Sequence, residues 1–198
     1  MNKNIKIATI LPYKENYTVS KAQAAAIWVA DFYKYSRFKE NNFIFGHTKD
    51  KDYLSKNYIN INISNLKSKF SSSTKEYCKN IIKKSKKMNF DIIEIHNRPK
   101  VFEYLSPKLK SKYILYFHND PLSMNGSISK NERVYLLKNL DKIIFVSKWV
   151  RNRFFENIDK KLIHKTEVVY PSIDKIKKFP NKEKKIVFVG KLNESKGY

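Results

Sequence analysis

The alternation of short apolar runs with segments of helical periodicity constrains the fold of this chain more than any other feature. The apolar runs predict β-strands at residues 5–11, 42–46, 58–63, 91–95, 112–117 and 142–146. Apolar residues at helical spacing predict helices at residues 22–35, 73–88, 101–109 and 132–140. Strands that alternate with helices are typical of βαβ units and of a parallel sheet. We therefore predict an α/β fold, with a doubly wound, mainly parallel Rossmann-like sheet and helices on both faces.

Two of the predicted helices begin with a capping-box pattern. In this pattern a Ser or Thr side chain accepts a hydrogen bond from the amide three residues later, and a Glu or Gln at that later position returns the bond. Ser20 with Gln23, and Ser73 with Glu76, match the pattern. We therefore expect Ser20 and Ser73 to mark helix N-termini.

The length and composition indicate one globular domain with an incomplete segment after it. The chain has 198 residues, of which 41% are hydrophobic, and this is enough for a substantial core. It contains no apolar run of about eighteen residues, and a strand-like segment follows residues 1–4 directly, so we predict neither a transmembrane helix nor a signal peptide. The one cysteine, Cys78, has no Cys or His near it in the sequence. We therefore expect a protein of the reducing cytoplasm.

The formal net charge of +23 raises the question of an anionic partner. Only five of the 41 basic residues are arginine, whereas recognition of phosphates and bases in nucleic acids favours the bidentate guanidinium group. No nucleic-acid-reading motif accompanies the charge, so we predict no nucleic-acid partner. Two explanations remain open. One is a compositional bias toward Lys, Asn and Ile, and the other is peripheral contact with the anionic inner face of a membrane through lysines such as Lys83, Lys84, Lys86 and Lys87.

Polar side chains gather in the loops that follow the predicted strands. The first loop spans residues 12–20, and two later loops begin with histidine, at residues 96–99 and 118–121. Parallel α/β sheets bind ligands outside the carboxyl ends of their strands, where such loops meet. The residues that we expect to lie together with the first loop at one edge of the sheet are His96, Asn97, His118, Asn119 and Asp120. The two histidines lack zinc spacing with a third ligand, so we predict no metal site.

A second candidate site lies near residue 198. Residues 186–189 form an apolar run that predicts a strand, and Gly190, Lys191 and Lys196 follow it. A buried strand that leads into a glycine-bearing basic loop is a common phosphate site, because amide and ammonium groups converge there on an anion. We therefore predict that Lys191 and Lys196 bind phosphate.

Together these segments resemble the family-4 glycosyltransferases, among them bacterial enzymes that build cell-surface polysaccharide from nucleotide sugars. The motifs that carry the resemblance, in order along the chain, lie at residues 91–99, 118–120, 141–150, 168–174 and 185–197. Enzymes of this family retain the anomeric configuration and consist of two facing Rossmann-like domains. The resemblance implies that this chain is the N-terminal, acceptor-side domain, truncated at the start of the donor-binding domain.

The resemblance also implies domain boundaries and residue roles. Residues 1–170 would form the acceptor-side domain, residues 171–184 the crossing between domains, and residues 185–198 the first strand and loop of an incomplete donor domain. The expected catalytic residues are His118 and Asp120, and the expected donor diphosphate-binding residues are Lys191 and Lys196. The expected acceptor-binding residues are Tyr13, Glu15, His96, Asn97, Arg98 and Asn119. The donor would be a nucleotide-diphosphate sugar, the acceptor a glycan or a lipid-linked sugar, and no cofactor is expected.

Several features depart from the family pattern. The first loop has no glycine pair, the crossing has Ser172-Ile173 where Asn-Gly is usual, and Lys191 replaces the commoner arginine. The Glu-x7-Glu element that grips the donor in the family has no counterpart before Tyr198. We therefore expect this chain alone to be inactive in sugar transfer. The alternative hypothesis is a non-catalytic, basic Rossmann-like module that binds anionic glycolipid or a partner protein.

Overall fold

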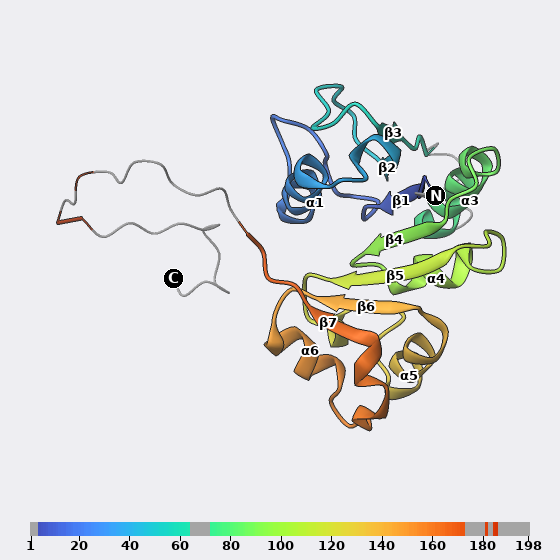
Figure 1. Cartoon of the computed structure of the whole chain (residues 1–198), viewed down its shortest axis with the longest axis vertical. Helices are drawn as coiled ribbons and strands as arrows, with labels where there is room; N and C mark the ends of the chain where they lie inside the picture. Colours follow the sequence, from blue (N-terminus) through green and yellow to red (C-terminus); the bar gives the residue numbers. More distant parts are fainter. Residues whose placement is uncertain (1–3, 64–71, 173–180, 182–183, 186–198) are drawn as a thin grey trace.

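The computed structural model describes residues 4–63, 72–172, 181 and 184–185. The first two of these ranges form a parallel α/β sheet domain (Figure 1). The described strands are β1 (Ile7–Ile10), β2 (Asn42–Gly46), β3 (Tyr58–Asn60), β4 (Ile92–His96), β5 (Lys112–Phe117), β6 (Lys142–Phe145) and β7 (Thr166–Val168). They form one seven-stranded sheet in the order β3-β2-β1-β4-β5-β6-β7, and every adjacent pair is parallel. The predicted Rossmann-like α/β fold is confirmed.

The direction of winding reverses at the centre of the sheet. From β1 the chain proceeds outward to β2 and β3, then crosses to the other side of β1 and proceeds from β4 to β7. The loops that leave the carboxyl ends of β1 and β4 therefore diverge. Doubly wound sheets bind ligands in the crevice that this divergence creates.

The two faces of the sheet are covered unequally. The described helices are α1 (Ala24–Tyr35), α3 (Ser73–Ser85), α4 (Pro99–Leu105), α5 (Lys130–Asn139) and α6 (Lys148–Phe154), with 3-10 turns η1 (Lys39–Asn41), η2 (Pro121–Ser123) and η3 (Lys160–Lys165). Side chains of α3, α4, α5 and α6 form the main core with one face. Among these described helices, only α1 contributes side chains to the smaller core on the opposite face. The prediction of helices on both faces is confirmed, with a thinner cover on the α1 side.

An aromatic cluster supports the loops that leave β5 and β6. Phe117 at the end of β5 stacks on Phe145 at the end of β6, with ring centroids 5.6 Å apart. Phe154 of α6 contacts both rings, and all three side chains are fully buried. Each ring removes a large apolar area from water, so the cluster fixes the carboxyl ends of these strands.

The helix N-termini differ in part from the predicted ones. Gln23 is the N-cap of α1 and its side chain makes no capping hydrogen bond, so the capping box predicted at Ser20 is wrong. The Glu15 carboxylate instead accepts a hydrogen bond from the Ala26 amide at 3.1 Å. In α3 the N-cap is Ser72, one residue before the predicted Ser73, and its hydroxyl oxygen accepts from the amide of Lys75.

The sheet also contains one strand that the sequence did not predict. Thr166–Val168 forms β7 and pairs with β6, so the start of the predicted crossing motif at residues 168–174 lies in the sheet. The strand predicted at residues 186–189 lies outside the described residues, as do most of residues 171–184. In the part of the chain that the structure describes, no helix has the length and apolar character needed to cross a bilayer.

Candidate functional site

Two histidines are in direct contact at the carboxyl ends of β4 and β5. His96 is the last residue of β4, and His118 directly follows β5. Nδ1 of His96 lies 2.8 Å from Nε2 of His118, so one of these nitrogens carries a hydrogen and donates a hydrogen bond to the other. The structure thus brings the two predicted loop histidines together at one edge of the sheet.

Aromatic side chains enclose the histidine pair. The His96 ring stacks on Tyr116 with centroids 4.5 Å apart, and Trp28 of α1 lies edge-on to the His118 ring at 5.1 Å. Burial lowers the pKa of His118 to about 4, and burial together with His118 lowers the pKa of His96 well below its ordinary value. Both rings are therefore neutral at pH 7. A neutral imidazole can accept a hydrogen bond from a substrate hydroxyl, which an imidazolium cannot.

Asn97 fixes the backbone beside the histidine pair. Its φ of 52° lies in the left-handed region, and its side chain is buried. The Asn97 amide N–H donates to the carbonyl of Tyr116 at 2.8 Å, and its Oδ1 accepts from the backbone N–H of His118 at 2.7 Å. Asn97 therefore ties the loop after β4 to the start of the loop after β5. These polar contacts of His96 and Asn97 are with other residues of the chain, and they position His118.

The first loop contributes Glu15 and Tyr13 to the same edge. Glu15 caps α1, and burial raises its pKa although the amides of Ala26 and Ala25 and the charge of Arg98 act in the opposite direction. Tyr13 stacks on His47, with ring centroids 5.2 Å apart. Both rings line a cavity of about 320 Å³ beside the ends of β1 and β2.

A larger cavity lies beside the loops that follow β4 and β5. Its volume is about 460 Å³, and its polar lining includes Ser72, Thr74, Arg98, Lys100, Ser123 and Asn125. Arg98 is exposed, and its Nη1 donates to the carbonyl of Asn97 at 2.7 Å. Lys100 forms an ion pair with Glu103 at 2.9 Å. The N-terminus of α3 adds a partial positive charge where Ser72 meets the cavity. This combination of cations and hydroxyl groups suits an anionic, hydroxylated ligand.

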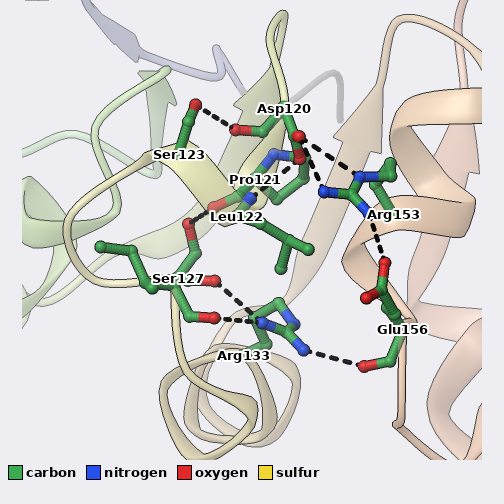
Figure 2. Close-up of polar contacts among 9 residues, drawn as sticks. Asp120, Pro121, Leu122, Ser123, Ser127, Arg133, Arg153 and Glu156 are labelled. Carbon is green, nitrogen blue, oxygen red and sulfur yellow. Dashed lines mark hydrogen bonds and ion pairs between the residues drawn. The ribbon is translucent and has the colours of Figure 1, made fainter.

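Asp120 connects the loop after β5 to α6 (Figure 2). Its Oδ1 accepts from the Leu122 amide at 3.0 Å and thereby caps η2. Its Oδ2 accepts from Nε and Nη2 of Arg153 at 3.2 and 3.1 Å. Arg153 also pairs with Glu156. Both carboxylate oxygens of Asp120 therefore have structural partners, and this engagement holds the loop that carries His118.

Arg133 anchors the next part of the same loop (Figure 2). The side chain comes from α5 and is 3% exposed. Its Nη1 donates to the carbonyls of Ser127 and Ile128, at 3.2 and 2.6 Å, and its Nη2 donates to the carbonyl of Glu156 at 2.8 Å. One buried cation thus joins the loop after β5 to the end of α6.

The remaining predicted residues do not all reach this site. Asn119 is exposed beside His118, and Lys191 and Lys196 lie outside the described residues. Sequence reasoning missed Tyr116 and Ser72. Tyr116 could have been found, because residues two apart on a strand share a face and Tyr116 precedes His118 by two. Within residues 4–63 and 72–172, no three side chains of the metal-binding types gather.

Sequence comparison does not assign the chain to a family. No protein-family model matches it, and no curated protein matches it. Structural comparison finds similar solved structures. The UDP-glucose complex of HepE from Anabaena superposes with a TM-score of 0.59 and 11% identity, over 85% of this chain and 44% of that one.

Two further structures have the same fold. A glycosyltransferase from Rickettsia africae has a TM-score of 0.54 and 19% identity, over 84% of this chain and 43% of that chain. Sucrose-phosphate synthase from Thermosynechococcus elongatus has a TM-score of 0.53 and 12% identity, over 83% and 48%. This chain therefore spans less than half the length of each of these proteins. At these identities the likeness establishes the fold, which is that of a Rossmann-like domain found in glycosyltransferases.

Proposed function

We propose that this chain is the acceptor-side half of a retaining, nucleotide-sugar-dependent glycosyltransferase of family 4. Its activity would be transfer of a sugar to a bacterial cell-surface polysaccharide or glycolipid. The observation that carries the proposal is that a neutral His96–His118 pair and a cationic, hydroxylated cavity both lie at the carboxyl edge of the sheet. Asn97 links them, because it lines the cavity and accepts a hydrogen bond from the His118 amide. The fold shared with HepE, whose structure contains UDP-glucose, supports the same conclusion.

The proposed mechanism gives each part of the edge a role. The acceptor would lie in the cavity beside Arg98, which binds an anionic group on it, and Asn119 and Tyr13 would contact its sugar hydroxyls. His118 would accept a hydrogen bond at the reacting centre, because its lowered pKa keeps the imidazole neutral. Asp120 would hold the loop that carries His118 in place, because its carboxylate is bound to Arg153 and to the Leu122 amide.

The donor half of the mechanism rests on residues beyond the described part. Lys191 and Lys196 would neutralise the diphosphate of the departing nucleotide, so that no metal or other cofactor is required. Sugar transfer also needs a second domain to exclude water from the reacting atoms. We therefore propose that the 198-residue chain is inactive alone. It would work at the inner face of the membrane, where lipid-linked acceptors are presented.

Nucleotide release tests the proposal directly. The purified chain is incubated with a panel of nucleotide sugars and a lipid extract, with and without a separately produced donor domain, and release of nucleoside diphosphate is measured. We expect no release from the chain alone and acceptor-dependent release with the donor domain. In that system His118→Ala should lower turnover more than donor affinity, whereas His164→Ala, an exposed histidine on η3, should change neither.

The same experiment separates the alternative function. A non-catalytic basic module would bind glycolipid or a partner but would release no nucleotide with any donor domain. Sustained release by the chain alone would show that it is a complete enzyme and would contradict the two-domain reading. An unchanged turnover in His118→Ala would remove His118 from the mechanism.

A further inference from the structure

A separate cavity lies between α1 and the sheet face that α1 covers. Its volume is about 220 Å³. A protein cavity of about 150 Å³ already holds a benzene molecule, so this one has room for a small organic ligand. Ile7 and Ile92 supply aliphatic wall, and the rings of Trp28, Phe32 and Phe38 supply aromatic wall.

A partly buried carboxyl group lines the cavity. Glu94 lies in the middle of β4, where its Oε2 accepts from the Thr9 hydroxyl at 3.0 Å and its Oε1 accepts from the Tyr116 hydroxyl at 3.3 Å. Among the described residues that line the cavity, Glu94 is the only acid and none is Lys or Arg. Burial raises the pKa of Glu94, so that ionisation is costly without a counter-charge. In a chain with 41 basic residues, this carboxyl group has no basic partner in the described part.

Three polar atoms on residues that line the cavity are shielded from solvent and lack a hydrogen-bond partner within the described residues. They are Nε1 of Trp28, the hydroxyl of Tyr33 and Nε2 of His96. Trp28 is 8% exposed and His96 is 1% exposed. Buried polar groups in folded proteins are almost always hydrogen-bonded, so these unpaired atoms show that the packing around the cavity is incomplete.

We propose that this cavity binds a small amino alcohol. The ammonium group would lie against the Glu94 carboxylate and the aromatic rings, because both attract a cation. The hydroxyl group would lie among the polar side chains of the lining, which include Thr9, Ser36 and Asn42. The site is distinct from the cationic cavity beside Arg98, and the inference does not depend on the proposed sugar transfer.

A pair of isosteric probes tests the charge requirement. Choline and 3,3-dimethyl-1-butanol have the same shape and hydroxyl group, but only choline is a cation. The chain has two tryptophans, so Trp149→Phe, a change at an exposed position, leaves Trp28 as the reporter of binding by fluorescence. We expect saturable quenching by choline in the millimolar range or below, with affinity at least about tenfold higher than for the neutral isostere. Tetramethylammonium, which lacks the hydroxyl group, should bind more weakly than choline.

Two variants test the residues. Glu94→Gln keeps the size of the side chain and should weaken choline binding at least about tenfold, whereas Glu103→Gln, remote from the cavity lining, should leave it unchanged. Thermal unfolding shows whether Glu94→Gln is folded, and the comparison of the two probes needs no variant at position 94. Equal affinity for choline and its neutral isostere, or no saturable quenching by choline, would overturn the proposal. Unchanged choline binding in folded Glu94→Gln would overturn it as well.

Discussion

Replacement of His118 by Gln should remove an acid-sensitive contribution to folding. In the folded chain burial lowers the pKa of His118 to about 4, whereas a histidine in an unfolded chain has a pKa of about 6.5. Between these two values the unfolded chain binds a proton that the folded chain does not. The free energy of unfolding therefore falls as the pH falls from 6.5 toward 4. Glutamine does not titrate, and its amide nitrogen can take the position of Nε2.

The magnitude follows from the two pKa values. Proton linkage at this one residue lowers the free energy of unfolding by about 2 kcal/mol at pH 5 and about 3 kcal/mol at pH 4, relative to pH 7. A typical domain has a total stability of about 5–15 kcal/mol, so this effect is large enough to measure. His96, whose pKa is also lowered and which contacts His118, adds to the acid sensitivity in the same direction.

Urea unfolding at pH 7, 6 and 5 measures this contribution. The quantity of interest is the difference in unfolding free energy between the wild type and His118→Gln at each pH. The effects of the carboxylates and of the +23 net charge are common to both proteins and cancel in that difference. We expect the wild type to lose about 2 kcal/mol more than the variant between pH 7 and pH 5. The exposed His164→Gln serves as the matched histidine control. Parallel curves for the wild type and His118→Gln would refute the reasoning.

Three other predictions concern stability and membrane contact. Arg133→Met should lower the free energy of unfolding by at least about 3 kcal/mol in urea, because it leaves three backbone carbonyls without their donor, whereas Arg151→Met should cost less than about 1 kcal/mol. Gly126→Ala should lower the free energy of unfolding by about 1–3 kcal/mol, because Gly126 has φ of +92° and the new Cβ would lie 3.1 Å from the Lys100 amide nitrogen. A loss no larger than that of Asn125→Ala would contradict this prediction. The chain should bind vesicles of anionic lipid in sedimentation assays and detach as the salt concentration rises. Equal binding to neutral vesicles would leave compositional bias as the explanation of the net charge.

The sequence predicted those parts of the fold that local patterns specify. The strand at residues 112–117 matches β5 at both ends, because a continuous apolar run at residues 113–117 lies there between polar residues. The start of α1 was predicted incorrectly. Its N-terminal amides are capped in part by Glu15, eleven residues before Ala26, and no local pattern encodes that contact. β7 was missed because three residues are too short a run to show periodicity.

The candidate site was predicted in place but not in detail. Parallel strands predicted that His96 and His118 would share an edge of the sheet. Their direct hydrogen bond depends on the register between β4 and β5, in which His96 pairs with Tyr116. The partner of Asp120 could not be predicted from the sequence either, because Arg153 follows Asp120 by 33 residues and belongs to another element. Such contacts arise from tertiary packing, and no sequence pattern of fixed spacing predicts them.

The strand order also has a consequence for the order of folding. Among the described strands, every pairing but one joins strands that follow each other in the chain, whereas β1 pairs with β4 across 85 residues. Closing so long a loop costs about 1 kcal/mol more entropy than closing one of about 20 residues. We therefore expect β1–β3 and β4–β7 to form as two blocks that join late. Glu94 and His96 lie on β4 along that seam, so a ligand held there would lock the blocks together and slow hydrogen exchange of the amides in β1 and β4.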